Sequence, residues 1–406
     1  MQKLFENKNK LYCFYDFQIC PASYDFFTFL YSAEISRMRR GLKEIELVLI
    51  QGPVEKFRGD WIRSTIVNEN FFNNVILPGI CILPSVTSFY WISKNELDIE
   101  TVPNGQRFPR GYRLSSPIDE YRAHELVAAK IRGDRPSFFS APEYAKTVVD
   151  NFIKQTIGGA PFVTVTAREI DRFNVNSTRN FDKKLWKNIF QEIKNIGVTP
   201  ILIRDTKNAF DQPVFKDIVE ANIASVHLPC RVALYEKAVL NFSRINGPAS
   251  LLLFGKGHSM IFAKFDDDST PVSRKWFSEH FGMDSGSQFP MTTTRTDYVW
   301  EPESAALIVD RIKRRLENPM MEEKLHDFSN SENVKFSFQT ALKHFIKCSS
   351  RDLMAEDAKL LERLNMLNND FGFFQNFEEK ITNWEGKNIP QGTIKLLKKQ
   401  FNLTLQ

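Results

Sequence analysis

The sequence predicts an α/β protein with two domains, each built on a parallel sheet, and a helical C-terminal segment. Short apolar stretches alternate with amphipathic ones in two separate series, and a stretch rich in Pro, Gly and Arg separates the two series. The chain has 406 residues, which is longer than one compact core commonly supports. At least two domains are therefore expected.

The first series starts with an apolar strand, a helix and a second strand. Ser23 is a good helix N-cap, apolar residues follow at helical spacing, and Gly41 ends the helix. This β-α-β unit is typical of a parallel sheet. The elements expected in the first domain, residues 1–115, are strands Leu11–Phe17, Glu46–Ile50, Val75–Leu83 and Ser88–Ser93 and helix Tyr24–Arg40.

The linker and the second series follow a stretch at about residues 100–116 that is typical of a loop. The linker, residues 116–158, contains two predicted helices, Ile118–Arg132 and Pro142–Gln155, and ends at a hinge near Gly158. The second domain, residues 159–320, is expected to contain strands Phe162–Thr166, Pro200–Ile203, Val239–Phe242 and Ser259–Phe265 and helices Asp182–Asn195 and Arg231–Ala238. The last segment, residues 321–406, is predicted to be helical at Leu353–Leu367 and Ile394–Leu405.

Composition limits the classes of ligand and location. The net charge of +5 is mild; it favours anionic ligands or a membrane surface and does not indicate nucleic acid. Five cysteines without a C-x-x-C pair indicate free thiols in a reducing compartment. The N-terminus has no apolar secretory segment, so a cytoplasmic location is expected, with peripheral contact at the inner face of the membrane left open.

The histidines give no sign of a metal centre. The six histidines show no metal-ligand spacing in the sequence, and no cysteine cluster accompanies them. No metal and no cofactor are therefore expected.

The turn Asn246-Gly247-Pro248 is a candidate phosphate site. It lies between a predicted strand and a predicted helix start, and a helix N-terminus offers unpaired N–H donors and a partial positive charge. Ligands of open α/β sheets bind at the carboxyl ends of strands. A nucleotide diphosphate could bind here, although the same residues are also common in plain turns.

Three arginines follow the first strand of the second domain. Arg168 directly follows the strand, and Arg172 and Arg179-Asn180 come next. A guanidinium group donates two hydrogen bonds to phosphate and keeps its charge, so these residues are candidate ligands of a diphosphate. Pairing with nearby carboxylates in a solvated loop is the alternative.

Further candidates lie in loops. Gln288 and Arg295 could cover a bound sugar or nucleotide, or belong to an ordinary surface loop. Asp16 and Asp25 flank the loop after the first strand, where a carboxylate could deprotonate a hydroxyl nucleophile. Asp25 has an alternative role, because a carboxylate in the first turn of a helix interacts favourably with the partial positive charge of the helix N-terminus.

These motifs carry a resemblance to glycosyltransferases of the GT-B class. The segment Arg231–Gly255 is similar to the heptosyltransferase-like and fucosyltransferase-like branches, and Thr166-Ala167-Arg168 resembles the latter at its arginine. The resemblance implies two Rossmann-like domains facing across a cleft, with a nucleotide-sugar donor held mainly by the C-terminal domain. It also implies metal-independent catalysis, with Arg168 stabilising the departing diphosphate.

The resemblance implies sugar transfer from a nucleotide-sugar to a hydroxyl acceptor. The acceptor would be a glycan or a lipid-linked glycan in bacterial surface polysaccharide biosynthesis, and Glu236 would bind the ribose of the donor unless it is only a helix-surface acid. Two alternatives stay open: a nucleotide-sugar epimerase or isomerase, and a non-catalytic nucleotide- or glycan-binding protein. A dehydrogenase is disfavoured because G-x-G-x-x-G follows neither first strand.

Overall fold

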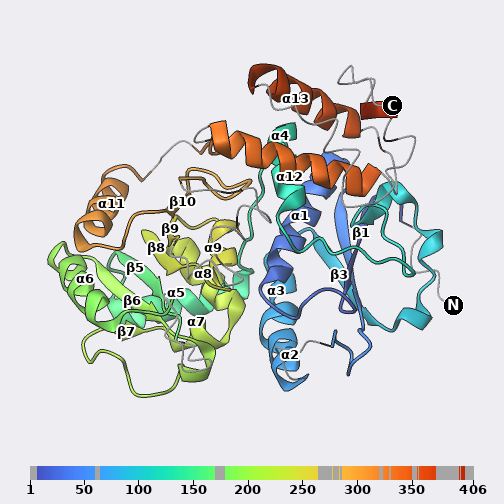
Figure 1. Ribbon diagram of the computed structural model, residues 1–406. Coiled ribbons are helices and arrows are strands. Elements are labelled where there is room, and N and C mark those ends of the chain that lie inside the picture. The colour runs from blue at the N-terminus through green and yellow to red at the C-terminus, as the bar shows by residue number, and fades with distance from the viewer. Residues whose placement is uncertain are drawn as a thin grey trace.

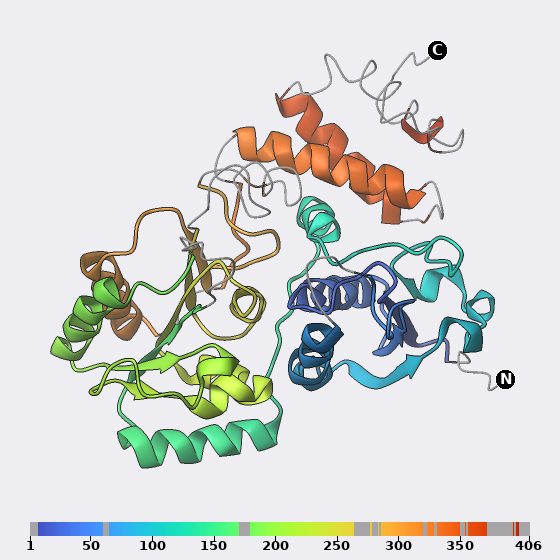
Figure 2. The same cartoon turned by 60° about the horizontal axis from the view of Figure 1, so that its bottom comes forward.

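The computed structural model describes residues 7–59, 65–169, 179–263, 277, 283, 286–319, 323–328, 331–349, 354, 356–371, 393 and 395–397. Within these residues the chain forms two parallel sheets with helices packed against them, so the predicted fold class is confirmed. Figures 1 and 2 show the two α/β units side by side. Among the described helices, none is long and apolar enough to cross a membrane.

The first sheet has the strand order β3-β2-β1-β4, and all of its pairings are parallel. The predicted β-α-β unit is confirmed, because α1 connects β1 to β2 and covers one face of the sheet. The strands are β1 (Lys10–Asp16), β2 (Glu44–Ile50), β3 (Val86–Ile92) and β4 (Arg107–Phe108), and the helix is α1 (Asp25–Arg39).

The predicted strand Val75–Leu83 is wrong, because this stretch is helical. It consists of α2 (Thr65–Phe71), a π-helix η1 (Phe72–Ile76), α3 (Leu77–Gly79) and a 3₁₀-helix η2 (Ile80–Ile82). Pro78 stands in the first turn of α3, a position that proline tolerates. A short apolar run fits a buried helix as well as a buried strand, so its pattern alone did not distinguish them.

The stretch rich in Pro, Gly and Arg covers the second face of the first sheet. It contains the 3₁₀-helices η3 (Lys94–Glu96), η4 (Ile99–Thr101) and η5 (Asn104–Gln106) and the short strand β4. Val102 and Tyr112 are buried there, and the Tyr112 ring stacks on Phe14 with ring centroids 4.9 Å apart. The stretch is mostly irregular, as predicted, but it belongs to the core.

Two helices connect the sheets. They are α4 (His124–Arg132) and α5 (Glu143–Ile157), and each ends at a left-handed glycine, Gly133 or Gly158. The predicted start of the first helix at Ile118 is wrong, because residues 118–123 are irregular and bury Ile118 and Glu120.

The second sheet has the order β10-β9-β8-β5-β6-β7, again all parallel. Helices α6 and α11 pack on one face, and α8 and α9 on the other. The strands are β5 (Phe162–Thr166), β6 (Thr199–Ile203), β7 (Val219–Glu220), β8 (Leu240–Arg244), β9 (Ser259–Phe262) and β10 (Thr296–Val299). The helices are α6 (Lys183–Asn195), α7 (Asn222–Val226), α8 (Leu228–Lys237), α9 (Ala249–Leu253) and α11 (Ala305–Glu317), with a 3₁₀-turn η6 (Thr206–Asn208) after β6.

Two C-terminal helices, α12 (Ser331–Ser349) and α13 (Glu356–Phe371), pack against α4 beside the first unit (Figure 1). Leu360, Leu361 and Leu364 of α13 are buried there, as their helical spacing predicts. Most of the predicted helix Ile394–Leu405 lies outside the described residues.

The two units share one apolar core. The Tyr31 ring of α1 stacks on Phe254, which follows α9, with centroids 4.2 Å apart, and Phe27 contacts Phe139 in the linker. Buried side chains from both sheets belong to this single cluster. The units are therefore packed against each other and not simply connected.

Candidate functional site

The strand order of the second sheet reverses direction between β5 and β8, the position here called the crevice. From β5 the chain adds β6 and β7 on one side, and it then returns to add β8, β9 and β10 on the other. The loops after β5 and β8 therefore leave the sheet in opposite directions. Ligands of open parallel sheets bind outside the carboxyl ends at such a switch point.

Arg168 and Asn180 meet at this crevice. Arg168 follows β5 after one residue, and its Nη1 donates to Asn180 Oδ1 at 2.5 Å. Arg244, the last residue of β8, donates to the Asn180 carbonyl oxygen and pairs with the Glu303 carboxylate. Glu303 and Asn180 hold the Arg244 side chain. Arg168 is half-buried near the carboxyl end of β5, where a guanidinium group can bind an anion.

Hydrogen bonds connect the residues that start the loops after β5 and β6. The Glu169 amide donates to Asp205 Oδ2 at 2.6 Å, and Arg204 donates to both Glu169 carboxylate oxygens. Burial raises the pKa of Asp205, although the Glu169 amide and nearby Arg231 partly oppose this shift. The residues that start the two loops are therefore held together by backbone and charge contacts before any ligand binds.

Tyr24 brings the first unit to the same place. It precedes α1, and a Cβ atom at Gly247 would lie 2.4 Å from the Tyr24 Cδ2 atom. Burial raises the pKa of the Tyr24 phenol. The positive charge of Arg231 lowers this pKa and the negative charge of Asp205 raises it, so both side chains lie close enough to act on the phenol. The carboxyl edges of the two sheets therefore meet at Tyr24 and Gly247.

The turn Asn246-Gly247-Pro248 follows β8, as predicted. Asn246 Oδ1 accepts a hydrogen bond from the Ala249 amide at 3.0 Å, so the Asn246 side chain satisfies the first amide of α9. The helix α9 is only five residues long. Gly247 gives the Tyr24 ring room to approach, which is a reason for glycine that the sequence pattern does not reveal. The phosphate role of the turn stays a prediction.

The two candidate bases differ in access. Asp16 ends β1, is 1% exposed and accepts hydrogen bonds from the Tyr112 hydroxyl at 2.6 Å and the Gln18 amide at 2.8 Å. Burial raises the pKa of Asp16, and both hydrogen bonds reduce the shift. Asp25 is exposed in the first turn of α1, where its Oδ2 accepts from the Ser23 hydroxyl at 2.7 Å. Asp25 thus directly follows Tyr24, at the meeting point of the two units.

Other candidates lie away from the crevice. Glu236 is near the end of α8, the helix that leads into β8, and so lies at the amino edge of the sheet, where its Oε1 accepts from the Ala141 amide at 2.7 Å. Arg295 precedes β10 at that same edge and binds Glu323 and the Lys256 carbonyl.

The Gln288 side chain makes two hydrogen bonds to the backbone of Tyr298 in β10. Arg172 lies outside the described residues.

Several residues at the crevice were not singled out by sequence reasoning. Tyr24, Asp205 and Arg231 come from three distant segments, and no local pattern connects them. A second missed group, Glu120, His344 and Cys348, is the one described set of side chains arranged to hold a metal ion. The four-residue spacing of His344 and Cys348, both on α12, was a signal available in the sequence.

No protein-family model matches the chain, and no curated protein does. Solved structures do resemble it. A family 9 glycosyltransferase from Veillonella parvula is 9% identical, with 77% of this chain and 98% of that chain covered and a TM-score of 0.45. The ADP-heptose lipopolysaccharide heptosyltransferase II of E. coli is 10% identical, with 77% and 99% covered and a TM-score of 0.39. The α,α-trehalose 6-phosphate synthase of Burkholderia multivorans is 10% identical, with 88% and 67% covered and a TM-score of 0.26. At these identities no residue role is transferred to this chain.

Proposed function

We propose that this chain is a glycosyltransferase that moves a sugar from a nucleotide-sugar donor to a hydroxyl acceptor. One observation carries the proposal: the carboxyl edges of two parallel sheets meet where Tyr24 packs against Gly247. Ligands of such sheets bind at these edges. Two edges in contact therefore offer neighbouring places for two substrates, which a group transfer needs.

The donor binds at the crevice between β5 and β8 in this proposal. Arg168 donates to the diphosphate and neutralises the charge that develops on it as the sugar departs. Asn180 orients Arg168 through the hydrogen bond between their side chains. Arg179, Arg172 and the turn at residues 246–248 are the further predicted contacts of the nucleotide.

The acceptor binds on the side of the first unit. Asp25, exposed beside Tyr24, removes the proton of the acceptor hydroxyl as the new glycosidic bond forms. The proposed acceptor is a glycan or lipid-linked glycan of surface polysaccharide biosynthesis. Peripheral contact with the inner face of the membrane is part of the same proposal, and the net charge of +5 supports attraction to an anionic surface.

A thermal-shift screen with nucleoside diphosphates and nucleotide-sugars tests the donor site. A ligand at 100 times its Kd should stabilise the chain by about 2.7 kcal/mol. Arg168→Ala should then lose about 1–3 kcal/mol of binding free energy by calorimetry. Arg295→Ala is the matched control, because Arg295 lies at the opposite edge of the sheet. If both variants lost the same binding free energy, or if Arg168→Ala lost none, the proposal that the donor binds at this crevice would be wrong.

Product analysis separates the proposal from its alternatives. With the bound nucleotide-sugar and a panel of glycan acceptors, a transferase yields a glycosylated acceptor and a free nucleotide. An altered nucleotide-sugar formed without acceptor would favour the epimerase or isomerase. Tight donor binding with no product from any acceptor would favour a non-catalytic binding protein.

A further inference from the structure

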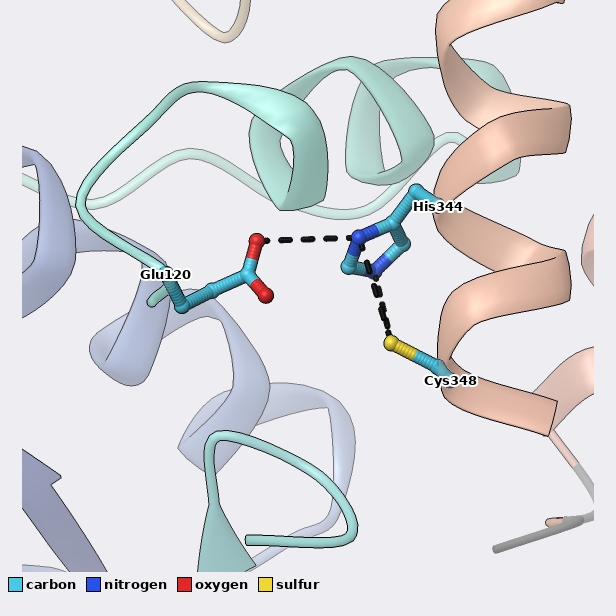
Figure 3. Close-up of side chains that lie close together, drawn as sticks. All are labelled: Glu120, His344 and Cys348. Atoms are coloured by element: carbon cyan, nitrogen blue, oxygen red, sulfur yellow. Dashed lines mark hydrogen bonds and ion pairs between the residues drawn. The ribbon is translucent and has the colours of Figure 1, made fainter. Parts of the chain in front are cut away.

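A buried polar cluster lies beside α4 and α12, apart from the crevice between the sheets. It consists of Glu120, from the segment before α4, and His344 and Cys348, from α12 (Figure 3). The three residues are 2%, 6% and 2% exposed. Their nitrogen, sulfur and oxygen atoms all lie within 4.8 Å of one another. These are the ligand types that zinc-class ions prefer.

Two of the separations are close to those of a tetrahedral metal site. His344 Nδ1 lies 3.6 Å from Glu120 Oε1, and Cys348 Sγ lies 3.9 Å from Nδ1 and 3.6 Å from Nε2. Bonds of about 2.0–2.3 Å in a tetrahedral zinc site place ligand atoms roughly 3.4–3.6 Å apart. The thiol lies slightly nearer to Nε2, so it must turn towards Nδ1 for the three ligand atoms to reach one ion.

A second carboxylate orients the histidine. His344 Nε2 lies 2.6 Å from Glu125 Oε2, and Glu125 Oε1 is held by Arg39 and Arg132, each at 2.6 Å. Metal binding requires the neutral ring with its proton on Nε2, from which it can donate to Glu125. Nδ1, which faces Glu120 in Figure 3, would then be the atom that binds the ion. Metal-binding histidines commonly have such a carboxylate partner on the other ring nitrogen.

Glu120 has an acceptor that the described part of the chain leaves unused. Its Oε1 is buried and accepts no hydrogen bond from any described residue, and this same oxygen is the one facing His344. A buried carboxylate oxygen without a hydrogen bond is costly, and the His344 contact at 3.6 Å is too long to supply one. A cation at this point would satisfy it.

The cluster lies in a network of buried charges. The network has five carboxylates, those of Glu120, Glu125, Asp134, Glu356 and Asp357, four guanidinium groups, those of Arg39, Arg40, Arg110 and Arg132, and the His344 ring. A divalent ion bound by a thiolate and a neutral imidazole contributes the same single positive charge as a protonated His344 beside a neutral Cys348. The ion can therefore replace two protons without changing the net charge of the network.

We propose that Glu120, His344 and Cys348 form a binding site for one divalent ion of the zinc class, with water as the fourth ligand. The ion connects α12 to the segment that leads into α4. Its role is to hold the C-terminal helices on the first unit, and it is independent of the proposed sugar transfer.

Cobalt binding to the full-length, chelator-treated protein tests the site. One Co²⁺ per chain should bind and give the visible bands of tetrahedral cobalt together with a thiolate-to-cobalt charge-transfer band, and Zn²⁺ should displace it. Cys348→Ser should lose the charge-transfer band. Cys81→Ser is the matched control and should keep it, because Cys81 is exposed and lies outside the cluster.

A stability readout complements the spectra. Zn²⁺ in excess of its Kd should raise the Tm of the wild type by a few degrees and leave that of His344→Gln unchanged. Folded wild-type protein that binds no stoichiometric Co²⁺, or a charge-transfer band that survives in Cys348→Ser, would overturn the proposal. The cobalt stoichiometry of the wild type tests the site even if a variant does not fold.

Discussion

At the residue scale, burial separates two carboxylates that the sequence pattern treats alike. Asp16 is buried beneath the Tyr112 hydroxyl, whereas Asp25 is exposed beside Tyr24. A general base must reach the hydroxyl that it deprotonates. Access therefore favours Asp25, and Asp16 acts as a buried hydrogen-bond acceptor at the end of β1.

Asp25→Asn should lower the turnover of sugar transfer about 100- to 10,000-fold at saturating donor, because an amide cannot accept the proton. Asp16→Asn should keep turnover within a few-fold of the wild type, since its side chain cannot contact the acceptor. Initial rates on the acceptor identified above measure both effects. A large loss in folded Asp16→Asn with a small one in Asp25→Asn would reverse the assignment.

At the element scale, the starts of α1 and α9 are in direct contact. A methyl group at Gly247 would meet the Cδ2, Cγ and Cβ atoms of Tyr24 at 2.4–3.2 Å. These atoms lie near the backbone, so the ring cannot simply rotate away. The glycine is therefore required by space at the contact between the two units.

Gly247→Ala should destabilise the fold by about 1–3 kcal/mol, as overpacking commonly does. Tyr24→Ala removes the obstructing ring, so Gly247→Ala should cost much less in that background. Chemical denaturation of the four proteins in this double-mutant cycle gives the coupling free energy. Additive losses would mean that the two residues do not meet.

The C-terminal helix α13 is connected to α1 by charge. Glu356 pairs with Arg39 at 2.9 Å and lies 3.5 Å from Arg40. Burial by itself would raise the pKa of Glu356, but the two guanidinium groups lower it to about 2. Because the folded pKa is below the unfolded value of about 4.3, this carboxylate stabilises the fold above that pH.

Glu356→Gln should therefore cost about 3 kcal/mol at neutral pH, on the scale of 1.36 kcal/mol for each unit of pKa shift. The difference in unfolding free energy between wild type and variant should shrink as the pH falls from about 5 towards 2. Urea denaturation at a series of pH values measures it. Glu362→Gln, further along α13 and exposed, is the control. A difference that does not depend on pH would contradict the ion pair.

At the scale of the whole molecule, the shared core couples the two units. Tyr31 and Phe254 belong to different units and stack with their ring centroids 4.2 Å apart. Each unit buries part of its apolar surface on the other, so neither is expected to keep full stability alone. Large hinge motion would have to expose these rings.

Phe254→Ala should destabilise the whole protein by about 3–5 kcal/mol, the usual cost of removing a buried phenylalanine. Protection against hydrogen exchange in the central strands of both sheets, β1 and β5, should fall together. Loss of protection confined to the second sheet would show that the units unfold separately.

Much of the fold could be predicted from local pattern. The segments of β1, α1, β5 and α6 have regularly spaced apolar residues, an N-cap residue or a glycine after the last turn. The predicted bounds of these elements agree with the observed ones to within one or two residues. The apolar run at residues 75–83 has no such signal, and its helical form depends on the core around it. Likewise, the irregular stretch that carries Tyr112 became core only because it covers a sheet face.

The sequence by itself determined the two parallel α/β units and the position of Arg168 close to the end of a strand, because strands, helices and turns depend on neighbours in the chain. Only the tertiary structure decided which candidates share a site. It brought Arg168 to Asn180 and Tyr24 to Gly247, and it placed Glu236 and Arg295 at the opposite edge. It also brought Glu120 to His344 across more than two hundred residues. Strand order and the packing of the units depend on long-range burial, which no local pattern encodes.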